Sequence, residues 1–373
     1  MKITILSPSY PYRGGIANFT DLLFSELKKN HKIIIYNFKR LYPNFLFPGK
    51  TQYETNENIN NITSFEVVDS INPLNWISIG NKIKNEKPDY LIIAFWLPFF
   101  APCLGTISQI VKKNNFTKII TICHNVIPHE KRFGDIAFTK YLFNNCDKFV
   151  LLSSKVENDL QMIKPGAKFI TLYHPVYSHF GDSVDKSDAK KFLNINDEKV
   201  ILFFGLVRKY KGLDILLNAL QLLKDKFKIK LIIAGEFYEN EEKYITLIDE
   251  LGLKENVKLY NEFIPTAEVK YYFSAADAVV LPYRDATQSG IVQVANNFLK
   301  PVIATNVGAL PEVVENNATG YLVEKENPEK LAQAILKYYN ENKEEEFSKN
   351  ISERLEKISW KNFTNELINF IEV

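Results

Sequence analysis

The stretch VILFFGLVRKYKGLDILL, residues 200–217, decides the fold of this chain. It opens with an unbroken apolar run, Val200 to Phe204, of the kind found in strands that are buried on both faces of a parallel sheet. After a glycine and a polar turn, apolar residues recur at helical spacing from Leu213 onward. The pattern Gly-x-x-Arg-x-x-Lys-Gly therefore places Arg208 and Lys211 in the turn between a strand and the N-terminus of the following helix.

Such a turn favours an anion as its ligand. Free backbone N–H groups and the positive end of the helix dipole point outward there, and the planar guanidinium of Arg208 matches phosphate oxygens. The alternative is a solvated basic turn that binds nothing, because charged loops are usually exposed to water. The rest of the chain has to decide between these two interpretations.

Length and charge limit the classes of protein. At 373 residues the chain exceeds the size at which one hydrophobic core stops growing, and its 46% of apolar residues supply two cores. The net charge of +2 gives no support to a general nucleic-acid binder. Residues 1–180 carry a net charge of +8 and residues 181–373 one of −6, which makes the first half the one suited to an anionic surface or substrate.

The cysteines and the apolar segments predict a protein of the reducing cytoplasm. Cys103, Cys123 and Cys146 are widely spaced and form no Cys-x-x-Cys pair, so neither a disulfide framework nor a zinc site is expected. The apolar run at residues 2–6 is too short for a signal peptide. The longest apolar stretch, Tyr90 to Leu104, contains two prolines and is shorter than the ~20 residues of a spanning helix, which predicts a buried strand running into a helix.

The order strand, glycine-containing loop and helix occurs twice in the chain. Residues 3–6 predict a strand, residues 7–15 a loop rich in Pro and Gly, and residues 16–27 a helix, as in the stretch at 200–217. Further strands are expected near residues 33–36, 90–95, 118–123 and 148–152, and then near 230–234, 257–260, 278–281 and 301–304. This alternation with helices predicts two doubly wound, Rossmann-like α/β domains that face each other across a cleft, with ligands at the C-terminal strand ends.

Two glycines precede the first helix. Gly14 and Gly15 carry no Cβ, so a phosphate or a sugar can approach the backbone closely. Alone the signal is weak, because many strand-to-helix turns use glycine. The pair does not complete the Gly-x-Gly-x-x-Gly pattern of dinucleotide binders, which disfavours a hydride-transfer enzyme.

His124 directly follows the strand predicted at residues 118–123. At a strand end its imidazole can donate a hydrogen bond to a sugar hydroxyl or stabilise developing charge. The alternative is a structural histidine. No third ligand is evident that would make a metal site of His124 and His129, and His174 is expected to be a loop residue without partners.

The segment LPYRDATQSGIVQVANNFLKPVIATNVGALPEVV, residues 281–314, predicts a second helix N-terminus near Ser289 or Gly290, with spare N–H donors. Asp285 and Gln293 lie on either side of this turn and can reach sugar and ribose hydroxyls. Each residue alone also fits a capping or surface role. Four strand ends that carry Gly-Gly, His, Arg/Lys and Thr-Gln-Ser-Gly nevertheless form one constellation.

At these residues the chain resembles the family 4 glycosyltransferases, which are retaining sugar-nucleotide enzymes with the two-domain GT-B fold. The resemblance covers nearly the whole chain and rests on SPSYPYRGGI, HNVIPHE, FGLVRKYKGLD, PYRDATQSG and KPVIATNVGALPEVV. It implies transfer of a sugar from a nucleotide-diphosphate donor to a glycan or lipid-linked acceptor in cell-surface polysaccharide or glycolipid synthesis. It also implies an acceptor-binding domain at residues 1–180, a donor-binding domain at 181–357, and a helix at 358–373 that crosses back to the first domain.

The resemblance also implies roles for individual residues. Arg208 and Lys211 would hold the donor diphosphate, and His124 would face the transferred sugar; these three are the catalytic candidates. A nucleobase is expected near residues 262–264. The implied donor-binding residues are Gly14, Gly15, Gly205, Glu262, Phe263, Ile264, Asp285, Thr287, Gln288, Ser289, Gly290, Ile291 and Gln293.

One position departs from the family pattern. The family usually has two glutamates separated by seven residues, which bind the sugar and the ribose, where this chain has Asp285 and Gln293. The shorter Asp285 puts the sugar contact in question. The sequence ATQSG resembles the replacement loop of a subgroup, in which backbone N–H groups of Ser289, Gly290 and Ile291 would take over sugar and phosphate contacts.

No cofactor and no metal are expected. Arg208, Lys211 and a helix end can neutralise a departing diphosphate, and no Asp-x-Asp lies near the expected cleft. Two other functions stay open: a sugar-nucleotide epimerase, which would need more carboxylates around the sugar, and a degenerate transferase that acts as a binding subunit, suggested by the altered glutamate pair.

The sequence gives the least information about the acceptor. Residues 39–50, KRLYPNFLFPGK, form an aromatic segment with basic flanks that could touch an anionic membrane or a lipid-linked acceptor. The alternative is a loop folded into the wall of the cleft. The chain is accordingly expected in the cytoplasm, either free or peripheral at the inner face of the membrane.

Overall fold

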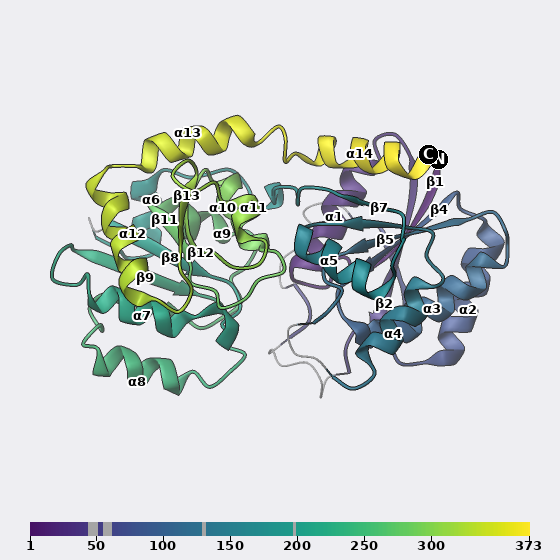
Figure 1. Ribbon diagram of the computed structural model, residues 1–373, viewed down its shortest axis with the longest axis horizontal. Helices are drawn as coiled ribbons and strands as arrows, with labels where there is room; N and C mark the ends of the chain where they lie inside the picture. Colours follow the sequence, from purple (N-terminus) through teal and green to yellow (C-terminus); the bar gives the residue numbers. More distant parts are fainter. Residues whose placement is uncertain (44–50, 55–61, 129–131, 197–198) are drawn as a thin grey trace. The chain divides into compact units, whose positions relative to one another are not determined.

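The computed structural model describes residues 1–43, 51–54, 62–128, 132–196 and 199–373. These residues form two compact units (Figure 1). Unit 1 comprises Met1–Pro175 and Ile358–Val373, and unit 2 comprises Val176–Lys357. Unit 2 thus begins slightly before the boundary expected after residue 180.

Unit 1 is built on a parallel sheet of seven strands in the order β3-β2-β1-β4-β5-β6-β7. The strands are β1 (Lys2–Leu6), β2 (Lys32–Arg40), β3 (Ser64–Asp69), β4 (Tyr90–Phe95), β5 (Lys118–Cys123), β6 (Lys148–Leu151) and β7 (Phe169–Thr171). The chain runs from β1 to one edge and returns to β4 on the other side of β1. The switch point of this sheet, where ligands of doubly wound folds bind, therefore lies between β1 and β4.

Helices cover both faces of this sheet. They are α1 (Gly15–Leu27), α2 (Pro73–Glu86), η2 (Pro98–Phe100), α3 (Ala101–Lys112), α4 (Asp135–Phe143), α5 (Ser154–Ile163) and α14 (Trp360–Glu372). The helices α2, α3 and α4 pack side by side as one layer (Figure 1). Right-handed crossovers place α1 on the opposite face, where α14 packs against it.

The C-terminal helix α14 belongs to unit 1 through aromatic and polar contacts. The ring of Phe19 in α1 lies 4.9 Å from that of Trp360 and 5.7 Å from that of Phe363. At the other end of α14, Tyr90 Oη donates a hydrogen bond of 3.3 Å to the carbonyl of Ile371. These contacts tie α14 both to α1 and to the start of β4.

Unit 2 repeats the architecture with a parallel sheet of six strands in the order β10-β9-β8-β11-β12-β13. The strands are β8 (Lys199–Phe204), β9 (Ile229–Ala234), β10 (Val257–Tyr260), β11 (Ala278–Leu281), β12 (Val302–Thr305) and β13 (Gly320–Val323). Its switch point lies between β8 and β11. These are the strands that precede the Arg208–Lys211 turn and the 282–289 loop.

The helices of unit 2 also form two layers. They are η3 (Ser178–Phe180), α6 (Lys186–Phe192), η4 (Lys209–Lys211), α7 (Leu213–Gln221), α8 (Glu242–Glu250), α9 (Val269–Ala275), α10 (Gly290–Asn297), α11 (Leu310–Val313), α12 (Pro328–Asn340) and α13 (Glu344–Arg354). The helix α7 packs against α8 and α12 on one side (Figure 1). On the other side α6 packs against α9, and η3 lies against α10.

The prediction of two Rossmann-like α/β domains with parallel sheets is confirmed. The apolar runs form buried strands because both faces of each sheet are covered, and each unit has its own hydrophobic core. The strands β3, β7 and β13 were not predicted. Within the described ranges, no helix combines the length and the apolar character needed to cross a membrane.

Candidate functional site

The basic turn of unit 2 is fixed by close backbone packing. It consists of Arg208 and the short helix η4, and Gly212 follows with φ +67° at the N-terminus of α7. A Cβ at this glycine would lie 2.1 Å from the carbonyl oxygen of Pro282, which excludes any other residue. The turn after β8 is therefore pressed against the loop after β11.

Two further glycines extend this packing to neighbouring loops. A Cβ on Gly235, after β9, would lie 2.3 Å from the carbonyl oxygen of Gly205. A Cβ on Gly308, after β12, would lie 1.5 Å from the carbonyl oxygen of Ala286. The loops at the C-terminal ends of four adjacent strands thus form one close-packed surface around the switch point of unit 2.

Lys211 is buried within this surface. Its side chain is 8% exposed, and a Cβ on Gly205 would lie 3.3 Å from Lys211 Nζ and 3.2 Å from Ile291 Cδ1. Burial, with a smaller contribution from the charge of Arg208, lowers the pKa of Lys211 to about 7. The structure therefore brings the predicted donor-site residues Gly205 and Ile291 together with the ammonium group of Lys211.

Arg208 lies beside this lysine. Its guanidinium carbon is 5.0 Å from the ring centroid of Tyr238, and its Nε is buried without a hydrogen-bond partner in the described part of the chain. No carboxylate of the described residues lies within 4.0 Å of the charged nitrogens of Arg208 or Lys211. Two adjacent cations without an internal counter-ion are expected where an anionic ligand completes the site.

A third cation, Arg284, differs from Arg208 and Lys211 because its N–H groups donate hydrogen bonds to protein acceptors. Its Nη1 and Nη2 bond Asp214 Oδ1 and Oδ2 at 2.9 and 2.7 Å, and Nη1 also donates to the carbonyl of Lys209 at 2.8 Å. The Arg284 backbone N–H donates to the carbonyl of Tyr210 at 2.6 Å. Burial alone would raise the pKa of Asp214, but the hydrogen bonds and charge of Arg284 hold it below its usual value. Arg284 therefore positions the basic turn.

The helix α10 begins beside this turn, and among the described residues no side chain caps its N-terminus. Ser289 is its N-cap residue, and its first turn carries no acidic residue. A Cβ on Gly290 would lie 3.1 Å from Cε2 of the buried Tyr177. The predicted start of this helix near residues 289 and 290 agrees with the structure, whereas sequence reasoning missed the tyrosine that covers it.

The polar residues around α10 occupy different environments. Thr287 and Gln293 are buried, and the Gln293 side-chain oxygen accepts a hydrogen bond of 3.2 Å from Asn296. Gln288 and Ile291 are half-buried. The structure thus gathers the residues from 287 to 293 at the start of one helix, adjacent to Lys211.

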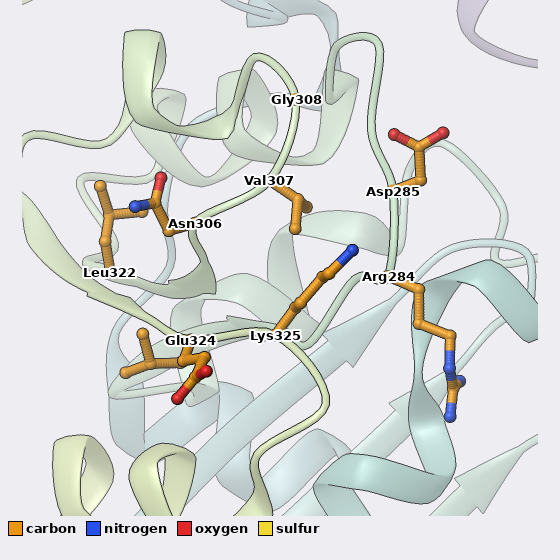
Figure 2. A pocket seen from close by; sticks show the side chains of 9 residues that line it. Arg284, Asp285, Asn306, Val307, Gly308, Leu322, Glu324 and Lys325 are labelled. Carbon is orange, nitrogen blue, oxygen red and sulfur yellow. The ribbon is translucent and has the colours of Figure 1, made fainter.

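Asp285 borders a cavity of about 580 Å³ at the ends of β11, β12 and β13. Figure 2 shows Lys325 extending into this cavity beside Val307, while the Arg284 guanidinium and the Asp285 carboxylate point away from it. Burial raises the pKa of Tyr210, the charge of Arg208 lowers it, and the charge of Asp285 adds a smaller upward effect.

The residues expected near a nucleobase lie after β10, at the edge of the same sheet. Ile264 is buried, Phe263 is half-buried and Glu262 is exposed. Asn261 ties this loop to the one after β9, because its Oδ1 accepts a hydrogen bond of 3.2 Å from the Phe237 N–H. These residues share the C-terminal edge of the sheet with Arg208, separated from it by β9.

In unit 1 the predicted glycines lie at the switch point of the sheet. Gly14 has φ +102°, and no atom of the described residues lies within 4 Å of the position that its Cβ would take. It precedes Gly15, the first residue of α1, and no side chain of the described residues caps this helix.

His124 follows β5 and is buried. Its ring lies edge-on to Phe19 at 4.7 Å, and the ring of His174 lies 5.4 Å from the same phenylalanine. Burial, and to a lesser degree His174, lowers the pKa of His124 to about 3, so the imidazole is neutral at physiological pH. His174 lies in a loop, as expected, but the expectation that it has no partners is wrong: it is buried, and its Nδ1 lies 2.9 Å from the Pro175 carbonyl oxygen.

Two predictions concern parts of the chain that the structure does not describe. They are the exclusion of His129 as a metal ligand and the possible membrane or acceptor contact of the aromatic segment, of which residues 44–50 lie outside the described residues. The described ranges contain no group of three or more His, Cys, Asp or Glu side chains that could hold a metal ion. The three cysteines are unpaired and buried.

The sequence is similar to known glycosyltransferases. Residues 185–357 match the family model described as glycosyl transferases group 1. The chain is 27% identical to an uncharacterized glycosyltransferase of Methanocaldococcus jannaschii, over 96% of this chain and 95% of the relative. It is 22% identical to the N-acetyl-alpha-D-glucosaminyl L-malate synthase of Bacillus anthracis, over 99% of this chain and 95% of that one.

Solved structures of low sequence identity share the fold. A sucrose-phosphate synthase from Thermosynechococcus elongatus matches with a TM-score of 0.76 at 16% identity, over 99% of this chain and 98% of that one. Anabaena HepE in complex with UDP-glucose matches with a TM-score of 0.75 at 17% identity, over 100% and 99% of the two chains. Together the matches support a glycosyltransferase with the GT-B fold, an enzyme that transfers a sugar.

The contacts of Arg284 predict that it stabilises the basic turn. We expect Arg284→Ala to lower the stability of unit 2 by about 1–3 kcal/mol, because a bidentate charged pair and a backbone contact are lost. Hydrogen exchange of residues 206–213 should accelerate, and Arg284→Lys should not restore it, since an ammonium group cannot bond both carboxylate oxygens in the same geometry.

The matched control is Arg354→Ala, which removes a pair of 3.2 Å with the more exposed Glu315. Pairs of this kind contribute little, so the exchange of residues 206–213 should stay unchanged in that variant. Equal exchange in Arg284→Ala and in the unmodified protein would show that Arg284 does not position the turn.

Proposed function

We propose that this chain is a retaining glycosyltransferase of the family 4 type that uses a nucleotide-diphosphate sugar as its donor. The observation that carries the proposal is the pair Arg208 and Lys211 beside the N-terminus of α10: among the described residues, no carboxylate pairs with these two cations and no side chain caps that helix. A diphosphate supplies the negative charge that this arrangement lacks. The UDP-glucose complex of Anabaena HepE, which has the same fold, supports this choice of donor class.

The basic turn and α10 would stabilise the departing diphosphate. Negative charge grows on the leaving phosphate as the bond to the sugar breaks, and the cations and helix N–H groups lie in place before that happens. Because these groups can neutralise the charge, we propose a reaction without a metal cofactor. The acceptor hydroxyl would form its bond on the same face of the sugar and pass its proton to a phosphate oxygen, which retains the configuration.

Unit 1 would contribute His124, Gly14 and Gly15. The neutral imidazole of His124 can exchange hydrogen bonds with sugar hydroxyls without adding charge to the site. A phosphate oxygen would approach the backbone at Gly14 and Gly15 and accept hydrogen bonds from N–H groups at the N-terminus of α1. These roles rest on the family resemblance together with the burial and conformation of the three residues.

The sugar and the ribose would be bound by the substituted pair. Gln293 accepts a hydrogen bond from Asn296, which leaves its amide N–H groups for ribose oxygens. Asp285 and the backbone N–H groups of Ser289, Gly290 and Ile291 would contact the sugar and the phosphates. The nucleobase would lie at residues 262–264.

The acceptor would be a glycan or a lipid-linked sugar of cell-surface polysaccharide or glycolipid synthesis. A panel of nucleotide sugars, analysed by mass spectrometry, tests the proposal and identifies the donor. Slow hydrolysis or transfer with one donor is the expected result. Nucleotide binding without turnover would instead indicate a binding subunit, a role suggested by Asp285 and Gln293 in place of the glutamate pair. Epimerised product would indicate an epimerase.

Arg208 is expected to be essential for turnover. Arg208→Ala should lower kcat/KM by orders of magnitude, because a charged contact with the leaving diphosphate is lost in the transition state. The fold should be retained, as judged by circular dichroism and thermal unfolding. Lys209→Ala, which removes an exposed side chain of the same turn, is the control and should keep near-normal turnover. Near-normal turnover in Arg208→Ala would contradict the assignment.

Binding of UDP, used as a probe, is expected to weaken as the pH rises from 7.5 to 9. The lowered pKa of Lys211, about 7, means that this group is mostly neutral in the free protein at that pH. Binding the anion must then take up a proton, which costs close to tenfold in Kd per pH unit. Calorimetry on Lys211→Arg should give a flat profile, because arginine stays charged. A flat profile in the unmodified protein would show that Lys211 does not titrate with binding.

We also propose contact with an anionic membrane from the cytoplasmic side. Besides the basic and aromatic segment at residues 39–50, unit 1 exposes Phe133, just before α4, and Ile136 and Phe138 in its first turn, between Arg132 and Lys140. Apolar side chains among cations suit an anionic lipid surface. Flotation should show binding to vesicles with anionic lipid and little binding to neutral vesicles. Equal recovery with both lipid compositions would refute the contact.

A further inference from the structure

We propose that Asp21 is a positioning residue that, together with Asn37, holds the loop between β1 and α1 in the conformation that presents Gly14 and Gly15 to the donor. The claim about the donor rests on the proposed function, whereas the claim about the loop does not. Asp21 and Asn37 come from different elements, α1 and β2. Both side chains are directed at the same short stretch of the loop.

That stretch is the Ser9–Tyr10 segment, and Asn37 binds three of its backbone groups. Asn37 Oδ1 accepts a hydrogen bond of 3.2 Å from the Ser9 N–H. Its Nδ2 donates to the Ser9 carbonyl at 3.0 Å and to the Tyr10 carbonyl at 2.9 Å. Asn37 is fully buried, so these bonds replace water for both partners. The side chain pairs with the loop as a neighbouring strand would.

Asp21 binds the remaining backbone group. Its two carboxylate oxygens each lie 3.3 Å from the Tyr10 N–H, and Oδ1 also accepts the Ser9 hydroxyl at 2.5 Å. The four polar backbone groups of Ser9 and Tyr10 are thus all bonded by two side chains. A buried loop segment whose groups are satisfied in this way has one favourable conformation.

The held segment is only a few residues from the glycines. The chain runs from Tyr10 to Gly14, and α1 begins at Gly15. Because Asp21 lies on α1 itself, it fixes the loop relative to the helix whose N-terminus would receive the phosphate. A second bond between the same elements, 2.6 Å from Ser7 Oγ to Thr20 Oγ1, limits movement at the start of the loop. These bonds fix the loop on both sides of Pro8, a few residues before Gly14.

Asp21 also makes the anchoring sensitive to pH. It is 7% exposed, and burial raises its pKa to about 7 against the lowering effect of Ser9 and Tyr10. Those two residues and the neutral Asn37 face the carboxyl group, and among the described residues no charged group contributes to its pKa. When the loop opens, Asp21 returns toward its ordinary pKa. By linkage, the closed loop is favoured most at low pH, and opening becomes easier as the pH rises to about 7.

Hydrogen exchange of the full-length chain tests the anchoring without any ligand. After correction for the intrinsic rate, exchange of residues 7–15 should accelerate by close to tenfold per pH unit between pH 5 and 7 and level off above. Asp21→Asn keeps an acceptor without a charge, so its exchange should be slow and independent of pH. Asp21→Ala should exchange about tenfold faster than the unmodified protein at pH 5.

The matched control is Asp89→Ala. Asp89 accepts the Lys2 N–H at 2.7 Å, at the opposite end of β1, so its removal should leave the exchange of residues 7–15 unchanged. Unchanged exchange in Asp21→Ala would overturn the anchoring role. A pH-independent profile in the unmodified protein would overturn the coupling to Asp21.

Donor kinetics test the functional half of the proposal. Asp21→Ala should raise KM for the nucleotide sugar about tenfold, with a smaller change in kcat, and Asp21→Asn should restore KM. Faster exchange with unchanged KM would show that the loop is anchored but does not serve the donor. If no nucleotide sugar is turned over by the unmodified protein, the proposed function fails, while the exchange data still decide the role of Asp21.

Discussion

The structure of the candidate site depends on the burial of Lys211, to which the described residues offer no counter-ion. Removing a charged ammonium group from water is costly, and proteins usually pair such a group or leave it neutral. Lys211 can become neutral, because burial lowers its pKa and it loses its proton at little cost. Arg284 is paired instead, since the carboxylate of Asp214 neutralises its charge. The two side chains therefore differ: Arg284 is paired with a protein carboxylate, whereas the described residues offer no such partner to Lys211, which is where the proposed diphosphate would bind.

This burial is possible because the surrounding loops approach backbone to backbone. At Gly212, Gly235 and Gly308 a single added carbon would overlap a carbonyl group of the neighbouring loop. Four loops are thereby fixed without large side chains of their own, which leaves the space between them to Lys211, Gly205 and Ile291. Unit 1 holds its glycine loop differently, through the buried polar side chains of Asn37 and Asp21.

The sequence predicts what is encoded locally. Apolar runs such as 200–204 identify the central strands, and the glycine-rich turns identify the strand ends where the candidate residues lie. The strand β7 has three residues and no fully buried position, so it carries no periodic signal. The bond between Arg284 and Asp214 joins residues 70 positions apart, and the packing of His174 on Phe19 joins two elements of unit 1. Such contacts depend on how the elements pack, which neither local sequence specifies.

The two units differ in electrostatics in a way that suits the two parts of a nucleotide sugar. Around His124 the environment is aromatic and uncharged, and a cationic imidazole there is excluded by burial. A neutral hydrogen-bonding group discriminates among hydroxyl positions by geometry alone, as an uncharged sugar requires. Around Lys211 the environment is cationic and includes helix N–H groups, as a diphosphate requires. Burial keeps the imidazole of unit 1 neutral, whereas the basic turn of unit 2 has no carboxylate of the described residues within 4.0 Å of its charged nitrogens. This difference agrees with the proposed donor, in which negative charge would develop on the diphosphate and not on the sugar.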